Sequence, residues 1–517
     1  MYSRLNVPRE VCFLLLCTVL CNLTMIGSGS TIGYSSVVLS VLMSNHSSIT
    51  LNATEMPLFV SLPVISQIFG CLLSLITMKY GRRCSMVIAN ATCSLGWIVI
   101  ASSYSVTQLF IGRMLTGAAI GICATAVPIY LEEISTPSWR EFLTITPNTG
   151  LAFGVVIVYF LGFLMQDNWR LIATLCIIPP TLSMLFTIFF IPESPVWLLT
   201  KCRKEAARIA LLRIRGLLQE TVEFREEFAK MANYNEQLKK LESEQSCRSD
   251  VSSTEETSDE SSSTMSVWDK LKSILRTICL PEVWKPLAIL NFYFIFQQFS
   301  GVYVITAYAV DMIVNAKITM DPFLITVVIG IIEVVVTLIA ACCSSRIGRR
   351  TISIVSGIGM SISLGALGTY MQFFEDASVA VLPLVCILVF VTFASFGFLV
   401  IPWAMIGELY PTKYVSVLGP LTTFFACVFN FGALQLYPTM VTQDETATIY
   451  FYCLISVVAT FYLTIALPET RGKTKQQIEE AFRRNSRVKD AREISEATDG
   501  KHRSSDLFDF VWHGPAD

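Results

Sequence analysis

Charged residues are scarce in this chain, and histidine is nearly missing. Asp, Glu, Lys and Arg make up 15% of the 517 residues, whereas soluble proteins of ordinary composition carry about 25%. The histidines are His46, His502 and His513. Apolar residues account for 53% of the sequence, and the mean hydropathy is +0.58. This composition excludes a soluble globular protein and indicates a chain that crosses a membrane several times.

The chain also lacks the patterns of an enzyme or a metal centre. Its 16 cysteines contain no two spaced Cys-x-x-Cys pairs, and many lie inside apolar runs, where they are expected to act as small packing residues. No nucleophile–base motif is recognisable, and a net charge of −2 gives no indication of nucleic-acid binding. We therefore expect no catalytic activity, no metal, no cofactor and no nucleic-acid partner.

The apolar residues form twelve runs that are long enough to cross a bilayer, six on either side of a polar middle. A helix needs about 20 apolar residues to span the hydrocarbon core. The first run is too long for a removable signal peptide and has no small-residue cleavage site, so it is expected to be a span. The expected spans are 11–42, 57–78, 84–104, 107–131, 144–165, 170–191, 283–310, 322–344, 352–373, 379–406, 416–440 and 446–467.

Basic residues are confined almost entirely to alternate turns between these spans. Lys and Arg follow spans two, four, eight and ten, and the exceptions are Arg170 and Lys317. The positive-inside rule then puts both termini and the polar middle in the cytoplasm, and we expect a multi-pass protein of the plasma membrane. Glycosylation sequons begin at Asn45 and Asn52, in what becomes the first outer loop.

Four parts are expected along the chain. The polar middle begins with short amphipathic helices, and its residues 243–264 are rich in Ser, Thr, Glu and Asp, which is typical of disorder. The tail is expected to begin with a short helix at 476–482. The parts are an N-terminal six-helix bundle at 1–200, a cytoplasmic linker at 201–280, a C-terminal six-helix bundle at 281–470 and a cytoplasmic tail at 471–517.

The two halves of the chain carry the same three landmarks in the same order. Each half has a Gly-Arg-Arg triplet, then an acid shortly after the proline of a long apolar run, then a Pro-Glu pair. Such duplication is one way in which transporters are built. The sequence therefore predicts an all-α membrane protein, with twelve transmembrane helices in two pseudo-symmetric six-helix bundles and cytoplasmic linker helices. The landmarks are at Gly81, Glu133 and Pro192 in the first half, and at Gly348, Glu408 and Pro468 in the second.

The repeated arginines and acids predict a gate at the cytoplasmic ends of the bundles. Guanidinium groups bind carboxylates through two parallel hydrogen bonds, so such pairs would form when the ends of the two halves approach and break when the halves rock apart. The alternative is that the arginines only set the topology. The candidate gate residues are Arg82, Arg83, Glu133, Arg140, Glu193, Arg349, Arg350, Glu408 and Glu469.

Six longer motifs are spread over both halves of the chain. They are Arg113-x-x-x-Gly117-x-x-x-Gly121, Val127-Pro128-x-Tyr130-x-x-Glu133, Pro192-Glu193-Ser194-Pro195-x-Trp197, Gln297-Gln298-Phe299-Ser300-Gly301, Ile401-Pro402-Trp403 and Pro468-Glu469-Thr470-Arg471-Gly472. With these motifs the chain resembles the sugar porter family of the major facilitator superfamily over roughly residues 10–485, and most of all its facilitative trehalose and glucose transporter-like branch. The resemblance implies the major facilitator fold and transport by alternating access.

The chain departs from this family at the gate. Met78 and Ser345 stand where the family has an Asp before each triplet, Val196 replaces an Arg after the Pro-Glu-Ser-Pro run, and Val415 replaces an Arg after the acid of span ten. These departures lead to the hypothesis that the outward-open state is less stabilised than in relatives.

By the resemblance, spans one, four, seven and ten line a central cavity, in which amides bind sugar hydroxyls and aromatic rings stack on the sugar. Glutamines can instead join helices, and Trp403 can serve packing alone. Tyr308 and Tyr34 are candidates for an outer lid. The candidate substrate-binding residues are Asn148, Gln297, Gln298, Tyr303, Tyr308, Glu333, Trp403 and Asn430.

Four cavity positions depart from the family pattern. Tyr303 and Glu333 replace expected asparagines, Cys427 replaces a tryptophan, and Ser395 replaces an acid. An acid at the centre of a span costs about 2.5–3.5 kcal/mol on insertion scales, so Glu333 is expected to face water or a partner. It can accept a substrate hydroxyl, form a structural pair or carry a proton.

We expect a facilitative carrier of a hexose, or of a disaccharide such as trehalose, that works by alternating access. Span one contains no acid, where the family's proton symporters have an Asp, and this favours uniport. One alternative is a non-transporting sugar sensor, which is suggested by Tyr303, Cys427 and the loss of charged family residues at the gate. Another is a proton-coupled carrier of a different polar solute. The expected partners are the sugar and membrane lipid, and the chain is expected to be monomeric.

Overall fold

The computed structural model consists of helices and connecting segments. It describes residues 9–43, 49–52, 54–136, 139–166, 168–217, 219–233, 235–236, 281–315, 320–373, 381–410, 415–471, 477 and 482. Within these residues, twelve helical segments are long and apolar enough to cross a membrane. The prediction of a twelve-span, all-α membrane protein is confirmed, whereas residues 243–264 and Asn45 lie outside the described residues.

The first half of the chain contains spans one to six. Span six is divided into two helices, and the second of them begins with prolines in its first turn, where the missing proline N–H leaves no helical bond unmade. The helices are α1 (Arg9–Met43), α2 (Met56–Thr77), the 3-10 turn η1 (Met78–Tyr80), α3 (Arg82–Ala101), α4 (Val106–Ile134), α5 (Arg140–Leu143), α6 (Thr146–Leu164), α7 (Trp169–Leu175) and α8 (Ile178–Phe189).

The second half contains spans seven to twelve, and two of these are interrupted. Span seven breaks at Gly301, whose φ of +85° suits glycine, and span ten contains a π-helical segment. The helices are α13 (Pro281–Phe299), α14 (Val302–Asn315), α15 (Pro322–Ile347), α16 (Arg349–Phe373), α17 (Val381–Phe393), the π-helix η2 (Ala394–Phe398), α18 (Ile401–Leu409), α19 (Val415–Gln443) and α20 (Glu445–Ala466).

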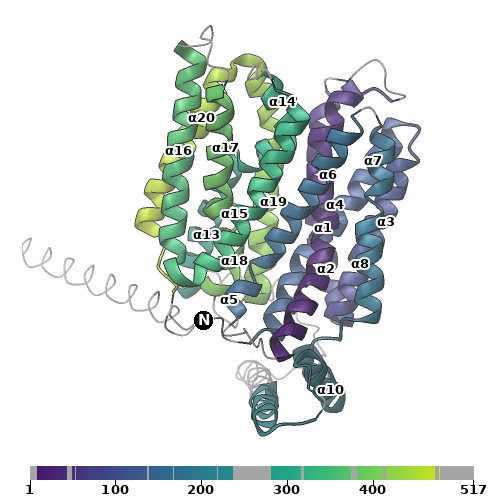
Figure 1. Ribbon diagram of the computed structural model, residues 1–517. Helices are drawn as coiled ribbons and strands as arrows, with labels where there is room; N and C mark the ends of the chain where they lie inside the picture. The colour runs from purple at the N-terminus through teal and green to yellow at the C-terminus, as the bar shows by residue number, and fades with distance from the viewer. Residues whose placement is uncertain are drawn as a thin grey trace, which may run out of the picture.

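Each half packs as its own bundle, and the two bundles stand side by side (Figure 1). The purple-to-blue helices form one group and the green-to-yellow helices form the other. The bundles meet where α6 contacts α15, where α2 contacts α19 and where α1 contacts α14. This arrangement agrees with the predicted pair of six-helix bundles.

Two short helices connect to the end of the first bundle. They are α9 (Pro195–Thr200) and α10 (Lys204–Ile214), and α10 lies below the bundles in Figure 1. We call this end of the molecule the linker side and the opposite end the loop side. Ile214 packs into the buried cluster of the first half, and the Arg215 guanidinium donates to the Ile134 carbonyl at 3.0 Å.

A salt-bridge network holds the linker helices together. The Arg208 guanidinium forms a salt bridge with the Glu220 carboxylate, and the hydrogen bond that it donates lowers the pKa of the Glu220 carboxyl below its ordinary value. Arg215 pairs with Glu227 at 2.6 Å. The linker is therefore attached to the first half by α10 and Arg215.

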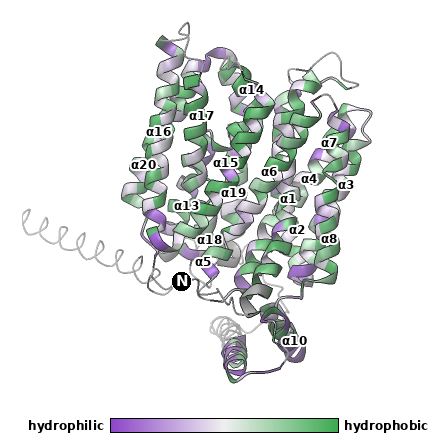
Figure 2. Cartoon of the chain, viewed as in Figure 1, coloured by the Kyte–Doolittle hydropathy of each residue, from purple (hydrophilic) through white to green (hydrophobic). Residues whose placement is uncertain are grey.

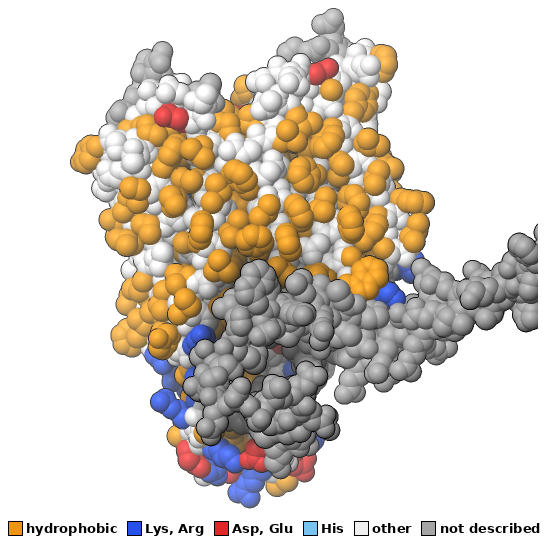
Figure 3. Space-filling model, turned by 180° about the vertical axis from the view of Figure 1, so that it is seen from behind, with side chains coloured by type: hydrophobic (Ala, Val, Ile, Leu, Met, Phe, Trp, Pro, Cys, Tyr) orange, Lys and Arg blue, Asp and Glu red, His pale blue; other side chains and the backbone are white. Residues whose placement is uncertain are grey.

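The outside of the bundles is apolar, as a lipid-facing surface requires. Figure 2 shows hydrophobic residues along the length of the spans, and Figure 3 shows a wide apolar belt on the reverse face. Lys and Arg gather at the linker side in the same view. Phe461 and Ile465 are 69% and 70% exposed; in water such large apolar patches are unusual.

Glycines allow α1 and α6 to approach very closely. A Cβ built on Gly154 of α6 would lie 2.1 Å from the Ile26 carbonyl oxygen, and one on Gly29 of α1 would lie 1.8 Å from the Leu151 carbonyl oxygen. Small residues at such contacts are how membrane helices pack backbone to backbone.

Breaks in the second-half spans leave backbone groups that other helices must satisfy. At span ten, the Ser356 hydroxyl of α16 donates to the Phe393 carbonyl at 2.6 Å and accepts from the Phe398 N–H at 3.1 Å. A serine on a neighbouring helix therefore bridges the π-helical break, as the absence of water in a bilayer demands.

A second break joins the two halves. Tyr308 has non-helical dihedral angles inside α14. In a regular helix the N–H of residue 310 would point to the carbonyl of residue 306. Here the Val310 N–H donates to the Ser36 hydroxyl of α1 at 3.2 Å, and the Thr306 carbonyl accepts from the Tyr159 hydroxyl of α6 at 2.7 Å. The kink thus gives α14 two partners in the other half.

The close contact at Gly154 predicts a strong effect of one methyl group. Gly154→Ala forces α1 and α6 apart and is expected to cost roughly 1–3 kcal/mol of stability, which lowers the thermal unfolding midpoint in detergent. Gly365→Ala is the matched control, because its Cβ would meet only the Cys453 sulfur at an ordinary 3.5 Å. Equal midpoints for the two variants would contradict this account of the packing.

Candidate functional site

The adjacent glutamines of α13 have different partners. The Gln297 amide donates to the carbonyls of Phe398 and Leu399 at 2.5 and 3.3 Å, at the end of the π-helix. The Gln298 amide donates to the Gln297 side-chain oxygen at 3.3 Å, and its own Oε1 is buried without a partner among the described residues. Gln297 therefore joins two helices, whereas Gln298 retains an unused acceptor.

An aromatic pair lies next to this glutamine segment. The Trp403 indole N–H of α18 donates to the Tyr303 hydroxyl of α14 at 3.0 Å. The Trp403 ring also packs edge-on against Phe294, with the ring centroids 4.8 Å apart. Both side chains are half-buried. The sequence predicted both residues for the site, and the structure connects them directly.

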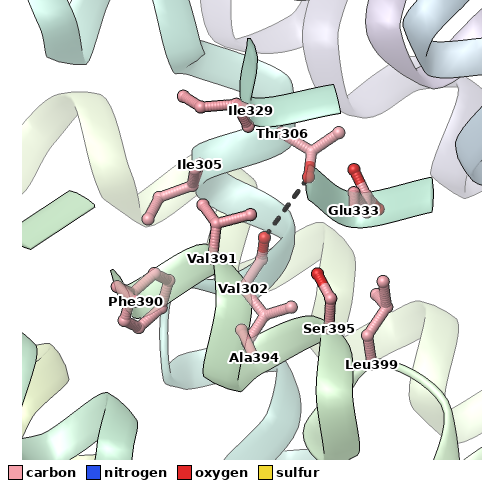
Figure 4. A pocket seen from close by; sticks show the side chains of 10 residues that line it. All are labelled: Val302, Ile305, Thr306, Ile329, Glu333, Phe390, Val391, Ala394, Ser395 and Leu399. Atoms are coloured by element: carbon pink, nitrogen blue, oxygen red, sulfur yellow. Dashed lines mark hydrogen bonds between the residues drawn. The ribbon is translucent and has the colours of Figure 1, made fainter. Parts of the chain in front are cut away.

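Glu333 lines a small pocket between α14, α15 and span ten (Figure 4). The pocket wall includes Thr306, Ser395 and Leu399. Figure 4 shows the side-chain oxygens of Glu333, Thr306 and Ser395 in this pocket, and the bond drawn there runs from the Thr306 hydroxyl to the Val302 carbonyl at 3.5 Å. The carboxylate and the two hydroxyls thus come from three different spans.

The Glu333 side chain is 4% exposed, yet it makes no hydrogen bond or ion pair with any residue that the structure describes. It interacts electrostatically with Tyr303 and with Tyr159 of the first half. One turn earlier, Gly330 lies against Val156 and Tyr159. Glu333 is therefore midway along its span, beside the interface between the bundles.

The remaining candidates lie apart from this pocket. Asn430 of α19 is half-buried, and its Oδ1 has no partner among the described residues. Asn148, the third residue of α6, donates to the Ile145 carbonyl of its own chain segment at 3.5 Å. Tyr308 is fully buried, donates to the Leu434 carbonyl at 3.3 Å and packs against Tyr437. It packs within the second half instead of covering an entrance.

The fold brings three residues to the site that the sequence did not predict. Thr306 lines the Glu333 pocket, and Tyr159 and Ser36 bind the α14 kink across the interface. Ser395, which the sequence placed at the cavity as the replacement of an acid, lines the same pocket. An isolated Ser, Thr or Tyr in an apolar span belongs to no recognisable motif. The only feature of the sequence that could have indicated these positions is a polar side chain within an apolar run.

In the first half, the gate residues form a compact cluster on the linker side. The Arg82 guanidinium binds Glu133 through two nitrogens, at 2.8 Å from Nη2 and 3.1–3.2 Å from Nε. Glu193 Oε1 accepts from the backbone N–H groups of Arg82 and Arg83 at 2.8 and 3.2 Å. The Arg83 side chain binds carbonyls at the end of α8. An acid at the start of α3 also complements the helix dipole.

The second half repeats this cluster. Arg349 binds Glu408 at 2.6 Å, Glu469 Oε1 accepts from the Arg349 N–H at 3.1 Å, and Arg350 binds the Thr464 carbonyl of α20. Two equivalent glycines make room for the acids. Gly81 and Gly348 have φ of +131° and +91°, and a Cβ on either would collide with Glu193 or Glu469, respectively.

The expected pairing across the two halves is wrong for these residues. Arg82 and Arg349 each bind an acid of their own half, and the Arg83 and Arg350 side chains bind carbonyls of their own half. Arg140 extends from α5 and contacts Ser135 at 3.4 Å. The bundles approach one another on the linker side elsewhere, where α5 contacts α15 and Glu132 lies near Gly407.

Two of the sequence motifs for glycosylation differ in accessibility. Asn52 is exposed in the loop between α1 and α2, on the loop side. Asn90 is 1% exposed and its amide binds Thr24 and Ser183, as expected for a sequon inside a span.

A comparison with known families assigns the chain. The model of the family described as Sugar (and other) transporter matches residues 14–482. The chain belongs to this sugar transporter family. The facilitated trehalose transporter Tret1 of Apis mellifera ligustica is 28% identical over 87% of this chain and 85% of its own length. The sugar transporter ERD6-like 7 of Arabidopsis thaliana is 27% identical over 87% of this chain and 90% of its own.

Solved structures of this family share the fold. The proton:xylose symporter XylE of the major facilitator superfamily, bound to 6-bromo-6-deoxy-D-glucose, aligns with a TM-score of 0.72 over 92% of this chain and 100% of that chain, at 19% identity. Inward-open XylE from E. coli aligns with a TM-score of 0.69 over 90% of this chain and 99% of that chain, at 20% identity. The predicted major facilitator fold is thereby confirmed.

The clusters on the linker side predict where energetic coupling occurs. In a double-mutant cycle, Arg82→Gln and Glu133→Gln should couple by about 1 kcal/mol, because the two groups are in direct contact. Arg82→Gln and Glu408→Gln should be additive, since these residues belong to different halves. The free energy of unfolding in detergent micelles is measured for each single and double variant. Coupling between Arg82 and Glu408 without coupling between Arg82 and Glu133 would show that the arginines pair across the two halves.

Proposed function

We propose that this protein moves a hexose or a disaccharide across the plasma membrane by facilitated diffusion. The substrate binds near the bilayer midplane, and the two bundles rock about it. The principal support is a set of polar groups inside the second half. Gln298 Oε1 and Asn430 Oδ1 are buried without a hydrogen-bond partner among the described residues, Glu333 is 4% exposed, and Trp403 donates to the Tyr303 hydroxyl. Such atoms are rare in finished packing and are suited to hydroxyl groups of a ligand.

Uniport is supported by the buried Arg113 of α4, because no carboxylate that could bind and release a proton is paired with it among the described residues. This guanidinium is 1% exposed and donates to the Thr31 carbonyl at 2.8 Å, to the Ser35 hydroxyl and to the Phe59 carbonyl at 3.4 Å. Among the described residues it forms no ion pair. The acids within the first-half spans are Glu132 and Glu133, at the linker end of α4. Arg113 therefore has no carboxylate nearby whose protonation could drive transport.

The linker side is the cytoplasmic side in this proposal. The concentration of Arg and Lys there supports it, and so does the exposed Asn52 in the opposite loop, which we propose as a glycosylation site together with Asn45. The protein would act as a monomer surrounded by lipid. Each arginine–glutamate cluster would then hold the cytoplasmic ends of one bundle rigid while the bundles move.

Uptake into proteoliposomes tests the proposed function. Radiolabelled glucose and trehalose should enter vesicles that contain the purified protein until the inner and outer concentrations are equal. An inward proton gradient should not change that end point, because no titrating acid accompanies Arg113. If the proton gradient drives the sugar inside the vesicles above its outer concentration, the protein is a proton-coupled carrier and not a uniporter. If no sugar enters, the alternative of a non-transporting sugar sensor is favoured.

The two glutamines should affect different quantities. Gln298→Leu removes the unused acceptor and is expected to raise KM about tenfold with little loss of stability. Gln297→Leu leaves the Phe398 and Leu399 carbonyls without a donor and should cost about 1–3 kcal/mol of stability. Uptake kinetics and thermal unfolding measure the pair; a KM effect confined to Gln297→Leu would contradict the assignment of Gln298 to the substrate.

A further inference from the structure

The interior of the second half contains acidic residues and no basic residue. Away from their linker ends, its spans contain Asp311, Glu333 and, at the loop end of the last span, Glu445. Residues 286–315, 320–344, 351–373, 381–410 and 415–466 contain no Lys, Arg or His. A buried carboxylate needs a cation or several hydrogen-bond donors to offset the loss of water. Within the described residues, the protein supplies neither to Glu333.

The pocket around Glu333 is rich in acceptors. The carboxylate, the Thr306 hydroxyl and the Ser395 hydroxyl present oxygens from three spans to the same space (Figure 4). A primary ammonium group has three N–H donors, whereas a sugar hydroxyl has one. Phe390, which also lines the pocket, adds an aromatic ring, and such rings attract cations.

We propose that the transported molecule carries a protonated primary amine, which binds between Glu333, Thr306 and Ser395, so that the preferred substrates are amino sugars. This inference rests on the proposed sugar transport and specifies the chemistry of its substrate. A hydroxyl at the same place would leave the carboxylate charge without a counter-ion, whereas an ammonium group neutralises it and has one N–H donor for each of the three side chains. Glu333 also lies beside the interface between the bundles, where alternating access exposes a site to each side in turn.

Three sugars that differ at one carbon test the proposal on the full-length protein. D-glucose, D-glucosamine and N-acetyl-D-glucosamine have a hydroxyl, an ammonium and a neutral amide at that carbon. Thermal stabilisation of the purified protein in detergent gives the affinities, and proteoliposome uptake gives transport. Glucosamine should bind about tenfold or more tightly than the other two.

Two variants show whether Glu333 causes the preference. Glu333→Gln keeps the shape and removes the charge, so the ratio of glucosamine to glucose affinity should fall to about one. Asp311→Asn is the matched control and should leave the ratio unchanged. Asp311 is the other buried acid of this half, with an unpartnered Oδ2, but it lies beside Tyr308 and outside the pocket.

The possible results distinguish a failure of the amine site from a failure of the proposed transport. Equal affinities for glucose and glucosamine in the wild type, or a preference that survives in Glu333→Gln, would overturn the amine site and leave sugar transport intact. Absence of binding and uptake for all three sugars would overturn this inference, and absence of trehalose uptake as well would overturn the proposed transport. If Glu333→Gln does not fold, the comparison of glucosamine with N-acetyl-D-glucosamine in the wild type remains decisive.

Discussion

A helix that breaks inside a membrane must find partners for its backbone within the protein, because hydrocarbon offers none. Besides the turn at Gly301, the spans of the second half of this transporter break at the Tyr308 kink of span seven and at the π-helical segment of span ten, and at these two breaks side chains from other helices complete the hydrogen bonding. Ser356 and Gln297 satisfy the π-helical segment of span ten, and Ser36 and Tyr159 satisfy the kink of α14. The geometry of the site depends on these few bonds.

The same bonds link structure to movement. Two of the groups that satisfy α14 belong to the first half, so rocking of the bundles must exchange these contacts for others or carry α14 along. The Glu333 pocket lies next to the same kink, because Thr306 contributes its hydroxyl to the pocket and its carbonyl to Tyr159. Binding of a ligand amine or hydroxyl in this pocket would therefore act on the helix that joins the two halves.

The repeated clusters on the linker side have a different role from the interface. Each is a closed unit of arginine, two acids and helix ends within one bundle, arranged around a glycine with positive φ. Such partly buried, bidentate pairs are stronger than exposed salt bridges. They stiffen the bundle ends that move as bodies, whereas contacts between the bodies involve hydroxyls, backbone groups and apolar side chains, which are easier to exchange.

The sequence by itself determined the twelve spans and the duplication, because bilayer thickness and the cost of burying charge act directly on composition and spacing. It identified Arg82, Glu133, Arg349 and Glu408 as partners in ion pairs, but not that each pair stays within one half. It singled out both Gln297 and Gln298, yet only the tertiary structure distinguished the helix-joining residue from the one with a free acceptor. The assembly of Glu333 with Thr306 and Ser395 was likewise decided by folding, since three distant spans converge there and no local pattern records which faces of packed helices will meet.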